Sequence, residues 1–205
     1  MPPLINGTIP TQINALGLGI FDGVHLAHQQ LIDQVDTVLT LHPHPNELIQ
    51  KKAMAYLTTI DERKFYIPQL LVLPFNQKTL TWSAQFFIDE IIFKQLNPKK
   101  IVVGYDYHFG YQKEGDLLFL RQQCHQRKID LVIVPPYKQG NQLIKSGVIR
   151  TLITTEFNQA IRLLGHPYLM IGTVVHGDGR GKTLGFPTAN VQVSDQKIVP
   201  EHGVY

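Results

Sequence analysis

The amino-acid sequence predicts an α/β protein in which helices cover a parallel sheet, followed by the start of a smaller all-β region. Five short apolar runs have the length and composition of buried strands, at 15–20, 37–41, 70–75, 100–104 and 130–136. Helical patterns alternate with these runs, which is typical of parallel strands joined by crossovers. After about residue 166 the apolar residues no longer recur at helical spacing, so the chain changes character there.

Composition narrows the protein class. The chain has 205 residues with 43% hydrophobic content, which is enough to fill a core. Its formal charge of +3 comes from scattered Lys and Arg residues, so we expect no nucleic-acid partner, whereas a phosphorylated small molecule is compatible. We also expect no membrane partner, because no run of about eighteen apolar residues and no secretory signal is present. The predicted location is the cytoplasm.

The first apolar run ends in the loop "GIFDGVHLAHQ", residues 19–29. Gly19 and Gly23 mark a tight turn, and beyond it apolar residues recur at helical spacing. The loop therefore opens a helix whose first turn carries His25 and His28. Both imidazoles share one face beside unpaired backbone N–H groups, an arrangement that favours anions.

Later segments predict further helices. Residues 83–96 repeat apolar positions behind Ser83 as N-cap, and residues 115–128 behave similarly. A helix over 154–165 has Thr155 as a possible cap and Gly165 as its end.

Three polar loops follow strands directly: residues 19–28, "HPHP" at 42–45 and "GYDYHFG" at 104–110. Ligands of parallel sheets bind beyond the carboxyl ends of the strands, so we expect these loops to form one site. Asp106, Tyr107 and Phe109 offer aromatic faces and a polar anchor for a ring-shaped ligand, although Phe109 is equally compatible with core packing. A surface location is the alternative for the His25/His28 pair, and a purely structural turn is the alternative for His42.

Two common nucleotide motifs are excluded by spacing. The dinucleotide fingerprint would need glycine where Asp22 stands, and the Walker motif would need glycine at His176. The two histidines of the first helix also lack the i, i+4 spacing of a helical zinc site.

The predicted domains are residues 1–165 and residues 166–205. The second contains two strand-like runs around a Gly-rich loop. With about 40 residues it is too short for a barrel, so we expect it to be incomplete in this sequence.

Seven segments in order resemble bacterial bifunctional riboflavin kinase/FAD synthetases, and the resemblance spans nearly the whole chain. They are "FDGVHLAHQ", "TLHPHP", "LTTIDERK", "LVLPFN", "VVGYDYHFG…GD", "AIRLLGHPY" and "GTVVHGDGRGKTLGFPTAN". The resemblance implies a Rossmann-like nucleotidyltransferase domain that makes FAD from ATP and FMN. It also implies the start of an all-β riboflavin kinase barrel, with Mg²⁺ as cofactor and small molecules (ATP, FMN and riboflavin) as partners.

The resemblance also implies roles for particular residues. His25 and His28 match the family's H-x-G-H motif that contacts ATP phosphates, and Arg150 completes the catalytic set. The implied nucleotide-binding residues are Gly19, Phe21, Asp22, Gly23 and Ser146. The implied flavin-binding residues are His44, Asp106, Tyr107 and Phe109.

The kinase motif carries its own implied site. Gly179 and Gly181 let backbone N–H groups approach phosphates closely. Arg180 and Lys182 supply positive charge. Thr188 and Asn190 are implied to hold Mg²⁺ and an ATP phosphate. The family's catalytic base lies beyond Tyr205, so riboflavin phosphorylation is not expected from this chain alone.

The chain departs from the family pattern at three places, the first being Ile20, where an asparagine is common. Ala27 replaces the glycine of H-x-G-H, and "KSGVIR" at 145–150 stands where S-S-T-R-I-R is usual, with Lys145, Gly147 and Val148 as the changed residues. Each lost donor to a transition state costs on the order of a hundredfold in rate. Two alternatives therefore stay open: a catalytically weakened or regulatory flavin/ATP-binding homologue, and an adenylyltransferase with another phosphorylated acceptor.

Overall fold

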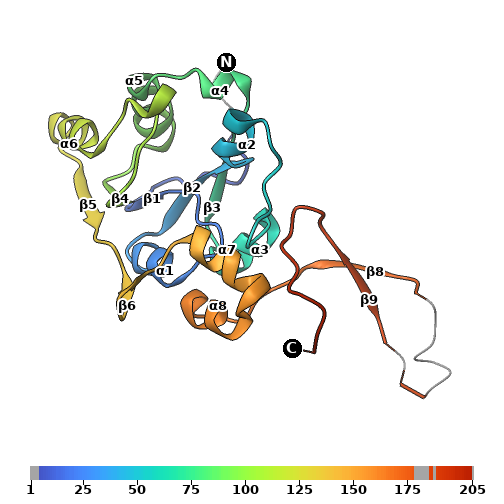
Figure 1. The fold of residues 1–205 in the computed structure, drawn as a ribbon. Coiled ribbons are helices and arrows are strands. Elements are labelled where there is room, and N and C mark those ends of the chain that lie inside the picture. Colours follow the sequence, from blue (N-terminus) through green and yellow to red (C-terminus); the bar gives the residue numbers. More distant parts are fainter. Residues whose placement is uncertain (1–4, 178–184, 187, 205) are drawn as a thin grey trace.

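A computed structural model describes residues 5–177, 185–186 and 188–204 of the chain (Figure 1). Its centre is a five-stranded sheet in the order β3-β2-β1-β4-β5, in which every neighbouring pair is parallel. The strands are β1 (Leu16–Leu18), β2 (Thr37–His42), β3 (Leu70–Pro74), β4 (Lys100–Gly104) and β5 (Asp130–Val134). The predicted parallel α/β sheet is confirmed.

Helices cover both faces of this sheet, which is why its strands are almost continuously apolar. In β4, Ile101 and Val103 pack into one core cluster, and Val102 packs into the other. The first cluster includes residues of α5 (Ala84–Phe86), of the π-helix η1 (Phe87–Leu96) and of α6 (Leu117–Gln126). The second cluster includes α1 (Leu26–Ile32) and the end of α3 (Ile60–Tyr66).

The helix starts follow local capping chemistry. The Ser83 side chain accepts a hydrogen bond from the Phe86 amide at 3.1 Å, so the predicted N-cap is confirmed. The Asp116 carboxylate caps α6 by accepting from the Phe119 amide at 2.8 Å.

The predicted helix over 154–165 is confirmed at its C-terminal end, whereas the predicted cap at Thr155 is wrong. Two helices cover this region, α7 (Ser146–Thr155) and α8 (Phe157–Leu164), and they meet at Glu156, whose φ of −142° is not helical. Thr155 lies in the last turn of α7, where its hydroxyl donates to the Thr151 carbonyl oxygen at 3.1 Å. The reason is tertiary: apolar residues of α7 and α8 pack into a third core cluster with Leu57 and Ile198. Gly165, with φ +75°, ends α8 as expected.

Several short elements have no strong signal in the sequence. They are α2 (Pro45–Gln50), α4 (Gln77–Leu80), η2 (Tyr111–Lys113) and the small hairpin of β6 (Lys138–Gln139) and β7 (Gln142–Leu143). Among the residues that the structure describes, no helix is both long and apolar enough to cross a membrane.

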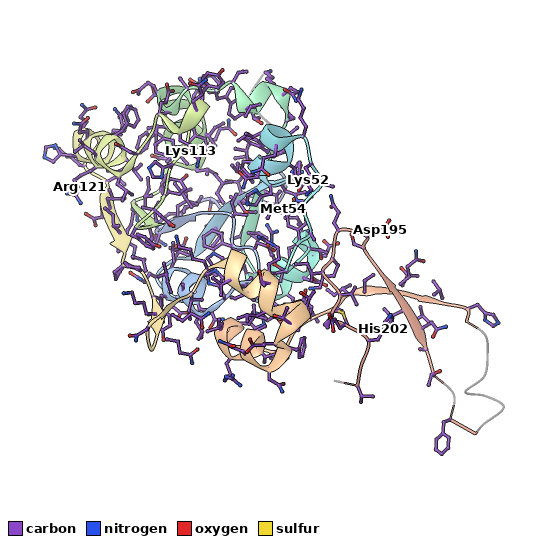
Figure 2. All side chains as sticks on the ribbon, in the orientation of Figure 1. Lys52, Met54, Lys113, Arg121, Asp195 and His202 are labelled. Carbon is purple, nitrogen blue, oxygen red and sulfur yellow. The ribbon has the colours of Figure 1, made fainter. Side chains whose placement is uncertain are left out.

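The C-terminal region contains an antiparallel pair, β8 (Gly172–Val175) and β9 (Asn190–Val193). Figure 1 shows this pair projecting from the α/β body, while the chain after β9 turns back toward α3. There the segment at Lys197 pairs with Tyr56. Figure 2 shows that side chains fill the space between the sheet and its helices.

Candidate active site

A cavity of about 700 Å³ opens at the carboxyl ends of the parallel strands. All five strands contribute to it, through residues such as Gly19, Leu41, Phe75, Asp106 and Pro135. The strand order reverses between β1 and β4, so the cavity lies at the topological switch point of the sheet. Ligands of doubly wound sheets bind at this point, because the loops diverge there and leave a crevice.

The structure brings most of the predicted site residues of the α/β domain to this cavity. Its walls include Gly19, Phe21, His25, His28, His44, Asp106, Tyr107, Phe109 and Ser146. Asp22 and Gly23 belong to the histidine loop but do not line the cavity, and Arg150, which binds Asp22, does not line it either.

The two imidazoles at the start of α1 stack on each other. Their ring centroids are 3.5 Å apart and the planes differ by 13°. His25 is the N-cap of α1, and its Nδ1 accepts a hydrogen bond from the His28 amide at 3.3 Å. The expected shared face is therefore present. Because Nδ1 of His25 accepts, a neutral His25 ring carries its proton on Nε2.

Burial keeps both rings neutral. It lowers the pKa of His25 to about 4, against smaller opposing effects from its backbone hydrogen bond and from Asp22. Burial also lowers the pKa of His28 well below its ordinary value, and the neighbouring His25 and Arg63 lower it further. At neutral pH this pair offers N–H donors and no positive charge.

The loop that carries this pair adopts uncommon backbone angles. Phe21 and Val24 have φ values of +56° and +43°, although neither is glycine. Such conformations cost on the order of 1–3 kcal/mol each and persist where the surroundings hold them. Gly23 has φ +88°, and a Cβ there would lie 2.8 Å from a Leu57 methyl group. The loop is therefore held by tertiary contacts.

Asp22 is the centre of those contacts. It is 2% exposed, and its carboxylate accepts from the Leu57 and Thr58 amides at 3.3 and 3.0 Å. Two guanidinium groups also donate to it, Arg150 at 2.7 Å and Arg63 at 3.5 Å. These four groups fill the carboxylate's acceptor sites. The geometry therefore makes Asp22 a group that orients Arg150.

Helix α7 begins beside the same loop. The Ser146 hydroxyl donates to the Asp22 carbonyl oxygen at 2.8 Å, and no side chain caps the first amides of α7. Lys145 lines the cavity and donates to Asp106 at 3.3 Å across it. A Cβ on Gly147 would meet nothing within 4 Å. A free helix N-terminus and a lysine are both favourable to an anion in the cavity.

The opposite wall of the cavity is aromatic and aliphatic. Tyr107 and Phe109 stack with ring centroids 5.5 Å apart, and Trp82 and Phe87 line the same wall. Phe109 is 8% exposed, so it belongs both to the core and to the cavity. Burial raises the pKa of Tyr107, so its phenol stays protonated. Such a wall suits a flat aromatic ligand.

His44 lies at the polar end of this wall. It is the N-cap of α2, where its Nδ1 accepts from the Asn46 amide at 3.1 Å. Its own amide donates to the Tyr56 hydroxyl at 2.8 Å, and that hydroxyl in turn donates to Glu47. Burial lowers the pKa of His44. His42 remains a residue of the strand end, with its Nδ1 buried and unpartnered among the described residues.

Arg63 supports the histidine loop, a role that the sequence argument missed. It is fully buried in α3 and donates to the carbonyl oxygens of Ile20 and Thr58, each at 3.0 Å. The detectable signal was the capping box Thr59/Glu62, which fixes the start of α3 and thereby the direction of Arg63. Nothing in the local pattern predicts its contact with Asp22, 41 residues away.

The kinase-like residues fall partly outside the described part of the chain. This applies to Gly179, Arg180, Gly181 and Lys182. Thr188 and Asn190 are both exposed, and Asn190 opens β9. Their side-chain oxygens are the hard ligands that Mg²⁺ prefers, and a site with few protein oxygens suits an ion that is also held by water and phosphate. Within the described ranges no cluster of three His, Cys, Asp or Glu side chains could hold a metal.

Two protein-family models match this chain. A family model described as FAD synthetase matches residues 10–148, and one described as riboflavin kinase matches residues 164–205. The first match ends at residue 148 and the second begins at residue 164.

Individual relatives match almost the whole of this chain. The bifunctional riboflavin kinase/FMN adenylyltransferase of Listeria monocytogenes is 36% identical over 95% of this chain and 68% of its own length. The enzyme of the same name from Escherichia coli K12 is 34% identical over 96% of this chain and 68% of its own. The crystal structure of a macrolide-efflux protein from Streptococcus pneumoniae is also similar, with a TM-score of 0.78, 30% identity, and coverage of 97% of this chain and 69% of that one.

Proposed function

Because the chain belongs to the bifunctional riboflavin kinase/FMN adenylyltransferase family, we propose that its α/β domain transfers AMP from ATP to FMN, with FAD and pyrophosphate as products. An oxygen of the FMN phosphate attacks the α-phosphorus of ATP, and the bond to the β-phosphate oxygen breaks. Negative charge grows on the departing pyrophosphate, so fixed donors near the phosphates lower the barrier.

The histidine loop supplies donors of this kind. Two stacked neutral imidazoles, His25 and His28, line the cavity at the start of α1. Because the N-cap hydrogen bond and the stacking of the two rings fix them before substrate arrives, little reorganisation is needed during the reaction. Arg150 adds a full positive charge behind this pair, and Lys145 adds another at the cavity wall.

The aromatic wall provides for the acceptor. We assign the flavin ring to the region of Tyr107, Phe109 and His44, and the nucleotide to the region of Gly19, Phe21 and Ser146. A 700 Å³ cavity has the size of a site for small organic ligands. The efflux activity in the name of the pneumococcal protein has no counterpart among these groups.

The C-terminal region is assigned to the start of the riboflavin kinase barrel, from residue 166. Thr188 and Asn190 would hold Mg²⁺ there together with an ATP phosphate, and the ion would neutralise phosphate charge during transfer. We place both activities in the cytoplasm, where ATP and flavins are available.

The observation that carries the proposal is that the histidine pair and an aromatic wall line one cavity at the switch point of the sheet. The test incubates the chain with ATP, Mg²⁺ and FMN, and separates the flavins by chromatography. We expect FAD to form, and we expect His28→Asn to lower its rate at least a hundredfold. His125→Asn, on the surface of α6, is the matched control and should leave the rate unchanged.

The comparisons lend no support to a purely regulatory homologue. The same assay separates the two readings, since FMN that binds tightly without conversion would support regulation and overturn the transferase proposal. Conversion of another phosphorylated acceptor in place of FMN would favour the third reading.

A further inference from the structure

An ion pair from the C-terminal region is completely buried against the α/β domain. Lys197, which follows β9, donates to Glu62 of α3 at 2.8 Å, and both side chains are 0% exposed. The ammonium also lies 3.9 Å from the centre of the Tyr168 ring. Taking an ammonium and a carboxylate out of water costs several kcal/mol per ion, so the position of this pair is tightly specified by its partners.

The same ammonium holds the loop that supports Asp22. Lys197 Nζ donates to the Leu57 carbonyl oxygen at 2.5 Å. The Thr58 amide, which belongs to the same peptide unit as that carbonyl, donates to the Asp22 carboxylate from the other side, at 3.0 Å. Asp22 in turn binds Arg150 at 2.7 Å. A continuous series of contacts therefore runs from Lys197 to Arg150 through one peptide unit and one carboxylate.

Backbone pairing fixes Lys197 in this place. The Tyr56 amide donates to the Gln196 carbonyl oxygen at 2.7 Å, and the Ile198 amide donates to the Tyr56 carbonyl oxygen at 3.0 Å. The Tyr168 hydroxyl donates to the Ile198 carbonyl oxygen at 2.8 Å. The segment after β9 is thus a short partner strand for the residues that precede α3.

We infer that Lys197 is a positioning residue for the adenylyl-transfer site: it holds the 56–59 loop against Asp22 and thereby fixes Arg150, which binds Asp22 in the loop that carries the histidine pair. The inference rests on the proposed function for its catalytic consequence. It means that a segment within the riboflavin kinase match completes the site of the preceding domain.

The test must separate this role from a loss of folding. Lys197→Met alone leaves Glu62 buried without a cation, which destabilises the fold. The double variant Lys197→Met/Glu62→Gln removes both charges, and the amide oxygen still accepts from the Thr59 or Ile171 amide. Lys94→Met/Glu90→Gln is the matched control, because that pair is exposed on η1.

The first measurement is hydrogen–deuterium exchange, which needs no activity. In the double variant, exchange of the Leu57 and Thr58 amides should rise at least tenfold, while β4 stays protected and the control variant matches the unmodified chain. Unchanged exchange at these two amides overturns the inference, whatever the activity shows.

The second measurement is the rate of FAD formation from FMN and ATP. We expect the double variant to lower kcat/KM about tenfold at a temperature where circular dichroism shows it folded. Combined with Arg150→Gln it should add less than threefold to the loss that Arg150→Gln causes alone, because both act through Asp22. Independent, multiplying losses overturn the inference. Absence of FAD with the unmodified chain contradicts the proposed function and leaves the exchange result to decide this inference.

Discussion

Replacing Asp22 by Asn tests whether one buried carboxylate holds the site together. Asn has the same shape and keeps one carbonyl oxygen, which can still accept from the Thr58 amide at 3.0 Å. It removes the negative charge that faces Arg63 and Arg150. Arg63 then remains fully buried with only neutral acceptors, the carbonyl oxygens of Ile20 and Thr58.

The size of the effect follows from these contacts. Breaking a buried ion pair by removing one partner costs about 3–5 kcal/mol. Arg150 is 26% exposed and regains some hydration when it is released, so we expect the lower end, about 3 kcal/mol. With a urea dependence of about 2 kcal/mol per molar, the unfolding midpoint should fall by about 1.5 M. FAD formation should fall about a hundredfold, because Arg150 loses its orientation.

The assays are urea unfolding followed by circular dichroism, and FAD formation at 25 °C. The matched control is Asp89→Asn, whose pair with Arg127 is partly exposed, at 40% and 30%, and should contribute under about 1 kcal/mol. If the free energy of unfolding of Asp22→Asn lies within about 1 kcal/mol of that of the unmodified chain, the idea that this carboxylate holds the site together is refuted. Full activity in that variant would show that FAD formation does not depend on Asp22 to orient Arg150.

Four further outcomes are expected. Gly23→Ala should lower the free energy of unfolding, measured by urea titration, by about 2–4 kcal/mol, because φ is +88° and the new methyl group would lie 2.8 Å from Leu57. A loss below about 1 kcal/mol would contradict the conclusion that tertiary contacts hold this loop in a strained conformation. Gly147→Ala should raise it by about 0.5–1 kcal/mol, since nothing lies within 4 Å of the new methyl group and α7 gains helix propensity; a destabilised variant would show that the space is not free. The free energy of unfolding should decline as pH falls from 6.5 toward 4, because the pKa of His25 is about 4 in the folded state and 6.5 in the unfolded state, which therefore binds the extra proton. The contribution of His25 to this decline is about 3 kcal/mol, and a His25→Gln variant should lack that contribution when its stability is measured against pH. FMN should quench the fluorescence of Trp82, the single tryptophan, because it lines the aromatic wall; saturable FMN binding without quenching would place the flavin elsewhere.

The strands and the position of the site could be predicted from the sequence because they depend on local patterns. A short, continuously apolar run such as "KIVVG" indicates a buried parallel strand wherever it occurs, and β4 is found at those residues. The polar loops after such strands converge for a topological reason, so His25, His44 and Tyr107 reach one cavity.

Other features could not be predicted from the sequence, because each depends on a partner far away in the chain. Thr155 has the chemistry of an N-cap, yet α7 already occupies that stretch, since its apolar face packs against α8 and Leu57. Asp22 stays a predicted nucleotide-binding residue, and its sequence neighbourhood does not reveal that the structure surrounds its carboxylate with groups 35 to 128 residues away.

By itself, therefore, the sequence determined the α/β class, the family motifs and the residues available for phosphate and flavin chemistry. Only the tertiary structure decided which of these residues face the cavity and which hold others in place. The reason is physical: hydrophobic periodicity is a property of neighbouring residues, whereas the partner of a buried charge such as Asp22, Arg63 or Lys197 is set by which distant segments the fold brings within hydrogen-bonding distance.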